Sequence, residues 1–312
     1  MLAGDSAVPV TAAGGTVWAA RHDGNSLIGQ SGQVDESVSK LGVVSARPIG
    51  MFDSGFGGLT VMRAVIDLLP NEDVVYLGDT GRYPYGSRDQ AQVAGFSRQI
   101  AQHLVDEFDV KVLVVACNTA AAALSVDTLS LEVGVPVIGV IEPGARSLVT
   151  ATRSGRVAVI GTVGTVGSGA YQRAVLDANP TVDLTCAACP GFVEFVERGV
   201  TSGDEVTVLA ERLLAPVVEA NVDALLLGCT HYPYLARTIS TVMGPGVVLV
   251  SSADETAFEL RTDLLAAGLA SKRTRPGRLR FQSTGDVDWF VALGRRLLGP
   301  ELKKAERVDF PT

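Results

Sequence analysis

The feature of this 312-residue chain that most constrains its fold is a repeated unit, in which a short apolar run ends at a turn and leads into a helical pattern. From Pro48 onward this pattern predicts helices over residues 59–69 and 90–108 and strands over 49–52, 73–77, 112–116 and 135–140. Apolar strands that alternate with helices form a parallel, doubly wound sheet. The sequence therefore predicts an α/β fold.

The order of elements then repeats. Further strands are predicted over residues 157–161, 183–186 and 224–228, with helices from about Ser168 and over about 204–221. Asp53 precedes Cys117 by nearly the same interval as Thr162 precedes Cys229, which indicates two related halves. We expect two pseudo-symmetric, doubly wound parallel-sheet domains with the active site in the cleft between them, because open α/β sheets bind ligands at the carboxyl ends of their strands.

The expected domains divide the chain into three parts. Residues 1–46 are rich in Gly, Ser, Ala and Val without a sustained period, and they are predicted to form a disordered extension. Residues 47–143 form the first domain together with residues 253–312, whose helices and strand pack back on it. Residues 144–252 form the second domain.

Two cysteines occupy the same local setting at the end of a predicted strand. Cys117 is followed by Asn118 and Thr119, and Cys229 by Thr230, all of which can open a helix. The dipole and free N–H groups of a helix N-terminus favour the thiolate form of a cysteine. Two such thiols in equivalent places suggest a symmetric reaction, with a base on either side of one carbon atom.

Composition and charge exclude several classes of protein. A net charge of −8 argues against a general nucleic-acid binder, and no apolar run approaches the length of a membrane span. Four cysteines are too few for a disulfide scaffold, so we expect reduced thiols and a cytoplasmic location. The basic residues between 272 and 280 are interpreted as a solvated connection, with a phosphate site as the alternative.

Asp53 opens a glycine-rich turn that lacks both the order of a dinucleotide-binding loop and the lysine of a P-loop. A carboxylate just past a strand end fits an acceptor for an ammonium group or a partner for a thiol, unless it only caps the next helix. His231, two residues after Cys229, can tune the pKa of that thiol or carry its proton. Glu194 and Glu197 lie on one helical turn, and one of them could reach the cleft.

The sequence predicts neither a metal nor a cofactor. Cys186 and Cys189 have the spacing of half a zinc site, but the chain has no second C-x-x-C pair. None of the five lysines follows a motif suited to a Schiff base, which argues against pyridoxal phosphate. Carbanion chemistry in this protein would have to proceed without that electron sink.

Six motifs follow one another in an order typical of a known family: Asp53-Ser54-Gly-x-Gly-Gly-Leu-Thr, Pro84-Tyr85-Gly86, Cys117-Asn118-Thr119, Ser168-Gly-Ala-Tyr, Ala188-Cys189-Pro190-x-Phe-Val and Gly228-Cys229-Thr230-His231-Tyr-Pro. Over about residues 47–300 the chain resembles the glutamate racemases of the cofactor-independent aspartate/glutamate racemase superfamily. Residues 1–46 are not part of the family pattern.

The resemblance implies a two-base mechanism, in which one cysteine removes the α-proton of glutamate and the other delivers a proton to the opposite face. By analogy, Cys117 deprotonates the D-enantiomer and Cys229 the L-enantiomer. Asp53 would assist Cys117, and His231 and Glu197 would assist Cys229. The implied substrate-binding residues are Asp53, Ser54, Tyr85, Gly86, Asn118, Thr119, Thr230 and His231.

The resemblance further implies that the protein supplies D-glutamate for bacterial peptidoglycan, closes its domains around the substrate and forms a homodimer. Three alternatives stay open. The first is an aspartate or broad-specificity amino-acid racemase. The second is a binding protein that acts on a partner such as DNA gyrase, with residues 1–46 as the contact. The third is a cysteine hydrolase, which would leave one of the two thiols without a role.

Overall fold

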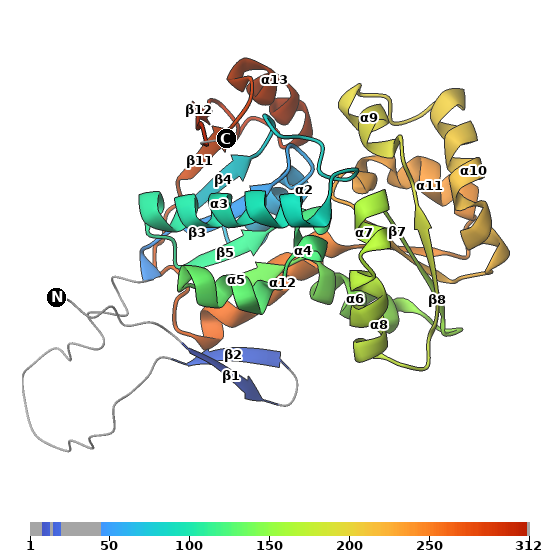
Figure 1. Ribbon diagram of the computed structural model, residues 1–312, viewed down its shortest axis with the longest axis horizontal. Coiled ribbons are helices and arrows are strands. Elements are labelled where there is room, and N and C mark those ends of the chain that lie inside the picture. Colours follow the sequence, from blue (N-terminus) through green and yellow to red (C-terminus); the bar gives the residue numbers. More distant parts are fainter. Residues whose placement is uncertain (1–7, 13–14, 20–44, 311–312) are drawn as a thin grey trace, which may run out of the picture.

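The structure is a computed structural model that describes residues 8–12, 15–19 and 45–310 (Figure 1). Two open α/β sheets lie side by side in two lobes. The chain passes from the first sheet to the second through α6 (Ile141–Ala151) and returns through α12 (Ser252–Ala266). These two helices pack against each other between the lobes.

The first sheet has six parallel strands in the order β12-β11-β4-β3-β5-β6. Its strands β3, β4, β5 and β6 are buried throughout, which explains why they appear in the sequence as continuous apolar runs. The strands are β3 (Ile49–Asp53), β4 (Val74–Gly78), β5 (Val112–Val115), β6 (Val137–Gly139), β11 (Leu279–Ser283) and β12 (Glu306–Arg307).

The second sheet has four parallel strands in the order β10-β9-β7-β8. They are β7 (Arg156–Gly161), β8 (Asp183–Ala188), β9 (Ala224–Gly228) and β10 (Val248–Ser251). Counted along the chain, the first, second, third and fourth strands of each half take the same places, β4-β3-β5-β6 in one sheet and β8-β7-β9-β10 in the other. The prediction of two pseudo-symmetric, doubly wound parallel sheets is confirmed.

Polar residues at N-cap positions start several of the helices that cover the sheets. The side chains of Asp89, Ser125, Ser251 and Asp286 each accept a hydrogen bond from a backbone N–H in the first turn of the following helix. The helices besides α6 and α12 are α2 (Leu59–Leu68), α3 (Gln90–Phe108), α4 (Asn118–Ala123), α5 (Val126–Val133), α7 (Val163–Gly167), α8 (Ala170–Ala178), α9 (Phe192–Glu197), α10 (Asp204–Glu219), α11 (Ala236–Met243), α13 (Val287–Leu297) and the 3-10 turn η1 (Tyr232–Leu235).

Two details of the second domain differ from the sequence prediction. The first helix was expected from about Ser168, but α7 begins at Val163 because the Thr162 side chain accepts a hydrogen bond from Thr165 N and caps it. A break at Gly169, with φ of 70°, then separates α7 from α8. Strand β10 was not predicted, because it lies at the sheet edge with Val248 exposed and shows no continuous buried pattern.

The predicted extension is only partly described. Strands β1 (Val8–Ala12) and β2 (Gly15–Ala19) form an antiparallel pair that the sequence pattern did not predict. Apart from residues 45 and 46, the rest of segment 1–46 lies outside the described residues, so its predicted disorder stays a prediction. We propose the domain division 47–143 with 253–312, and 144–252, because it keeps each parallel sheet whole.

The basic segment between residues 272 and 280 makes local contacts in the first domain. Arg273 forms an ion pair with Asp73, and the Arg280 guanidinium lies 5.8 Å from the centre of the Phe108 ring. Both contacts are local, as expected for a segment that connects α12 to β11. In the described part of the chain, no helix has the length and apolar character needed to cross a membrane.

Candidate active site

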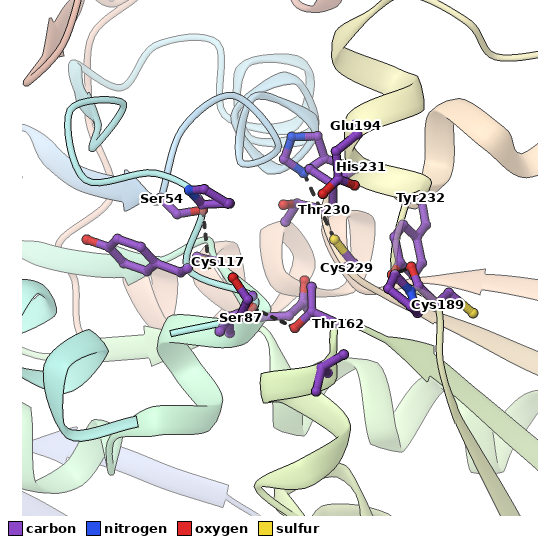
Figure 2. Close-up of a pocket in the computed structure, with 18 of the residues that line it drawn as sticks. Ser54, Ser87, Cys117, Thr162, Cys189, Glu194, Cys229, Thr230, His231 and Tyr232 are labelled. Carbon is purple, nitrogen blue, oxygen red and sulfur yellow. Dashed lines mark hydrogen bonds between the residues drawn. The ribbon is translucent and has the colours of Figure 1, made fainter. Parts of the chain in front are cut away.

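The carboxyl ends of the central strands of both sheets meet at one pocket of about 100 Å³ (Figure 2). Cys117 follows β5 and Cys229 follows β9, which are the third strands of the two halves. In Figure 2, Ser54 and Cys117 lie on one side of the pocket, and Thr162, Cys229 and His231 lie on the other. The two cysteines are 4% and 6% exposed. The pairing of two strand-end thiols across a cleft is thus present in the structure.

Cys117 is the N-cap residue of α4, and its Sγ accepts a hydrogen bond from Ala120 N at 3.4 Å. The Sγ also lies 3.7 Å from Ser54 Oγ. Burial, followed by the negative charge of Asp53, raises the pKa of the Cys117 thiol to about 12, although both hydrogen bonds favour the thiolate. The helix N-terminus favours the thiolate through Ala120 N, as expected, but desolvation outweighs this contribution.

Asp53 ends β3 and is fully buried. Its Oδ1 accepts a hydrogen bond from Gly55 N at 2.7 Å, and Thr230 Oγ1 donates to its Oδ2 at 3.3 Å across the cleft. Burial raises the pKa of Asp53, while the charge of His231 and these hydrogen bonds lower it in part. Asp53 therefore hydrogen-bonds to both halves of the molecule, although it does not itself line the pocket, and its charge helps to raise the pKa of Cys117.

His231 and Glu197 form a polar chain that ends at Cys229. The Cys229 Sγ lies 4.0 Å from His231 Nδ1, and His231 Nε2 lies 3.3 Å from Glu197 Oε1. Burial disfavours the imidazolium, but the contacts with Cys229 and Glu197 and the charge of Asp53 raise the pKa of His231 to about 10. These contacts therefore favour the charged form of the buried imidazole. Of the two candidate glutamates, Glu197 contacts His231, and Glu194 lines the pocket.

The residues that open helix α4 face the second domain. Asn118 Nδ2 donates a hydrogen bond to the Tyr171 hydroxyl at 2.7 Å, whereas its Oδ1 is buried and has no partner within the described chain. Thr119 Oγ1 lies 3.0 Å from Thr162 Oγ1 and 3.2 Å from Thr165 Oγ1. These contacts join the halves at the pocket, and they leave Asn118 Oδ1 as an acceptor for a ligand N–H group.

The loop between β4 and α3 supplies Tyr85 and Gly86 to the pocket. The Tyr85 hydroxyl donates a hydrogen bond to Asp79, so the ring forms part of the wall while its polar end is already occupied. Gly86 O accepts a hydrogen bond from Gly164 N of α7 at 2.8 Å. The predicted pocket residues of this loop thus shape the cavity and hold the second domain close.

The remaining cysteines do not build a metal site. Cys189 is buried and lines the pocket, while Cys186 lies on β8 and is partly exposed, and all four cysteines of the chain are free. The described residues contain no group of three or more His, Cys, Asp or Glu side chains arranged to hold a metal ion. Within the described residues, Cys186 and Cys189 therefore belong to no cluster that could hold a metal ion.

Comparison with known proteins agrees with this geometry. The family profile described as Asp/Glu/Hydantoin racemase matches residues 49–260. The glutamate racemase of Acidothermus cellulolyticus is 50% identical over 256 residues, which cover 82% of this chain and 96% of that protein. The glutamate racemase of Mycobacterium leprae is 50% identical over 254 residues, with coverages of 81% and 92%.

The chain belongs to the Asp/Glu/hydantoin racemase family.

Solved structures of this racemase family share the two-domain fold. Glutamate racemase isoform RacE1 of Bacillus anthracis aligns with a TM-score of 0.82 and 40% identity, covering 86% of this chain and 99% of that one. A Francisella tularensis glutamate racemase solved with D-glutamate aligns with a TM-score of 0.79 and 35% identity, with coverages of 85% and 98%. Membership of the racemase family makes the chain an enzyme of the isomerase class.

Sequence reasoning missed several residues that line the pocket of this racemase. Tyr83 and Ser87 flank the predicted Pro-Tyr-Gly motif, and Thr162 caps α7 by accepting a hydrogen bond from Thr165 N. The spacing of Thr162 and Thr165 is that of an N-cap residue and its N3 partner, which could have drawn attention to both. No sequence signal marks Tyr83, because its place in the pocket depends on the approach of the two domains.

Proposed function

We propose that this chain is a glutamate racemase that interconverts L- and D-glutamate without a cofactor, with Cys117 and Cys229 as the two bases. The observation that carries the proposal is the placement of two buried thiols, one from each half of the molecule, at one pocket. The relatives named glutamate racemase, at about 50% identity over most of the chain, support glutamate over other substrates of the family.

The reaction requires one proton transfer on each face of the α-carbon. From L-glutamate, the Cys229 thiolate takes the α-proton and becomes a thiol, while the electron pair stays on the α-carbon and its carboxylate. The Cys117 thiol then gives its proton to the opposite face and becomes a thiolate, which yields D-glutamate. The reverse direction exchanges the roles, so each thiol serves once as base and once as acid.

The charges of the pocket suit this assignment. The pKa of Cys117, raised to about 12 by burial and by Asp53, keeps this thiol protonated at neutral pH, as the acid of the L-to-D direction must be. His231, whose pKa is raised to about 10, stands as a cation 4.0 Å from the Cys229 sulfur and can donate a hydrogen bond to a thiolate there. Glu197 holds the far side of the ring.

A thiolate is a weak base for a carbon acid, so the pocket must stabilise the developing negative charge. The N–H groups that open helix α4 at Asn118 and Thr119, and those at Thr230 and His231, suit the substrate carboxylate. Asp53 and the unpartnered Asn118 Oδ1, with the nearby hydroxyl of Ser54, suit the ammonium group. Tyr85 and Gly86 close the wall, which excludes water and strengthens these interactions.

The decisive experiment is proton NMR of D-glutamate and of L-glutamate in D2O, with purified protein and a reductant. We expect the α-proton signal to disappear from both enantiomers as the antipode forms. Cys117→Ala and Cys229→Ala should each stop the formation of the antipode, and each should exchange the α-proton of one enantiomer only. Cys186→Ala, which changes a cysteine outside the pocket, is the matched control and should racemise normally.

Other outcomes separate the alternatives. Exchange of aspartate in preference to glutamate would establish an aspartate racemase, and no exchange of either would favour a binding protein. A covalent acyl-enzyme on one cysteine would point to a hydrolase. The supply of D-glutamate to peptidoglycan, the cytoplasmic location, the homodimer and the gyrase contact stay predictions. Deletion of residues 1–46, followed by assays of racemisation and gyrase binding, tests the last of these.

A further inference from the structure

The loop between β4 and α3, residues 79–89, supplies one wall of the pocket. Five consecutive residues of this loop, 83–87, line the cavity. Among them Tyr85 is almost fully buried, and its hydroxyl donates a hydrogen bond to Asp79, which is fully buried as well. Whatever holds the Asp79 carboxylate in place therefore also helps to fix the shape of this wall.

Arg82 connects the Asp79 carboxylate to two aromatic rings that lie outside the pocket. Its Nε donates to Asp79 Oδ2 at 2.8 Å and to Oδ1 at 3.0 Å. Its guanidinium lies over the Phe96 ring, 4.2 Å from the centre, and over the Phe310 ring, 4.8 Å from the centre. The Tyr85 ring also packs on Phe96, with 5.7 Å between the centres. Arg82 and Tyr85 thus share a carboxylate and an aromatic neighbour.

The two rings matter to Arg82 because its guanidinium has few other partners. Its Nη1 donates to Gln99 Oε1 at 2.5 Å, whereas its Nη2 is buried and has no hydrogen-bond partner within the described chain. The Arg82 side chain is 19% exposed. Attraction between a cation and an aromatic face is stronger where water is excluded, so each ring face contributes to holding this guanidinium.

Phe310 is itself held by the first sheet. It follows β12, which pairs with β11, and Val308 N donates to Ser283 O at 2.9 Å. The Phe310 ring meets the His103 ring of α3 edge to face, with 5.5 Å between the centres. The segment after β12 is therefore anchored at Ser283 and at His103, and it places the Phe310 ring on Arg82.

We propose, on the basis of the racemase function proposed above, that Phe310 is a positioning residue for the pocket wall. Its ring holds the Arg82 guanidinium on the Asp79 carboxylate, and this carboxylate fixes the Tyr85 hydroxyl and with it the loop. Phe310 does not line the pocket, so it acts through this chain of contacts. The segment after β12, at the edge of the first sheet, is thereby coupled to the active site.

The first test follows Tyr85 itself and needs no substrate. The chain has six tyrosines, so ring-labelled tyrosine gives few NMR signals, and Tyr85→Phe identifies the signal of Tyr85. We expect Phe310→Leu, which keeps an apolar side chain but removes the ring, to shift or broaden this signal. Phe310→Tyr, which keeps a ring, should leave it close to its wild-type position. An unchanged Tyr85 signal in Phe310→Leu would overturn the proposal even in a fully active racemase.

Phe108→Leu is the matched control for this experiment. The Phe108 ring also packs on His103, with 6.0 Å between the centres, and it is partly buried against the same core as Phe310. The rings over Arg82, however, are those of Phe96 and Phe310. The control should leave the Tyr85 signal unchanged. A shift in Phe108→Leu as large as that in Phe310→Leu would mean that the effect spreads through His103 and the core, and it would contradict the proposal.

The second test is kinetic. We expect Phe310→Leu to lower kcat/KM for glutamate by about 3- to 10-fold, and by the same factor in both directions because the enantiomers have equal free energy. Arg82→Met should lower it at least as much. Adding Phe310→Leu to Arg82→Met should change kcat/KM by less than about twofold, because the ring acts through Arg82.

The kinetic outcomes separate this proposal from the proposed function. Losses in Phe310→Leu and Arg82→Met that multiply in the double variant would overturn the role of Phe310, and so would a Phe310→Tyr protein as impaired as Phe310→Leu. A wild-type protein inactive on glutamate would instead contradict the proposed function, and the Tyr85 signal would still decide whether Phe310 positions the wall.

Discussion

Among individual residues, Asp53 shows most clearly that a residue of the site can lower the stability of the folded protein. It is a fully buried carboxylate with two hydrogen bonds and a neighbouring cation, and yet its pKa is raised, because burial disfavours its charge more than these contacts favour it. At neutral pH the charged form therefore costs stability in the folded protein. The same charge is one cause of the raised pKa of Cys117, so the cost is connected to the proposed chemistry.

Asp53→Asn should separate these two effects. We expect the free energy of unfolding at pH 7–8 to rise by about 1 kcal/mol, with a loss of racemase activity of about 10-fold or more. The folded pKa of Asp53 is raised, so the wild type regains stability as pH falls through it, and the difference from Asp53→Asn should vanish in acid below about 3.8. Urea denaturation of both proteins at several pH values measures this difference in the free energy of unfolding. A variant that is less stable than wild type at neutral pH would contradict the argument.

At the scale of elements, a buried ion pair ties the start of the first domain to the end of α12. Lys111 lies just before β5, and its Nζ is 2.6 Å from Glu72 Oε2. The same Nζ donates hydrogen bonds to Ser45 O at 2.9 Å and to Leu269 O at 2.8 Å. Both side chains of the ion pair are almost fully buried. Burial lowers the pKa of Lys111, although Glu72 opposes the shift. The contacts of this pair join four segments that are distant in the sequence.

Lys111→Met leaves the Glu72 carboxylate buried without its cation, so we expect a loss of about 3–5 kcal/mol in the free energy of unfolding. Replacing both residues, as in Lys111→Met with Glu72→Leu, should recover much of this loss. The exposed pair of Arg98 and Glu132, which joins α3 to α5, is the control, and Arg98→Met should cost less than about 1 kcal/mol. Equal losses for Lys111→Met and Arg98→Met would show that burial does not decide the effect.

Strands with a continuous buried pattern could be predicted from the sequence, and the exposed edge strand β10 could not. β3, β5 and β9 are buried throughout, so their ends, and with them the positions of both cysteines, followed from the apolar runs. β10 was missed because its edge position leaves Val248 exposed. In the site, strand-end residues such as His231 were recognisable, whereas Tyr83 reaches the pocket through a loop whose position depends on Asp79 and on closure.

At the scale of the whole molecule, Gly57 is a point of close approach between the two domains. A Cβ atom at this position would lie 2.1 Å from Thr230 Oγ1 and 2.5 Å from His231 Nδ1. Only a glycine therefore lets the first domain come this near to the residues around Cys229. The absence of a side chain at Gly57 is a condition for closure rather than for the fold of either sheet.

Gly57→Ala should accordingly hold the domains apart without unfolding them. We expect kcat/KM to fall by about 100-fold or more, because misplacing the two thiols by about 1 Å is enough to do so. Small-angle X-ray scattering should show a larger radius of gyration, with the melting temperature little changed. Gly95→Ala in α3, where a Cβ atom meets nothing within 4 Å, should keep activity and add about 0.5–1 kcal/mol of stability. A fully active Gly57→Ala protein would contradict this account of closure.

The route of the chain also sets the order in which the halves can be completed on the ribosome. All strands of the second sheet have been synthesised by Ser251. In the first sheet, β4 pairs with β3 but lacks its second neighbour until β11 emerges with residues 279–283. The second sheet, which begins later in the chain, can therefore be completed first. During that interval β4 presents an unpaired edge, which is the part of a nascent sheet most prone to pair with another molecule.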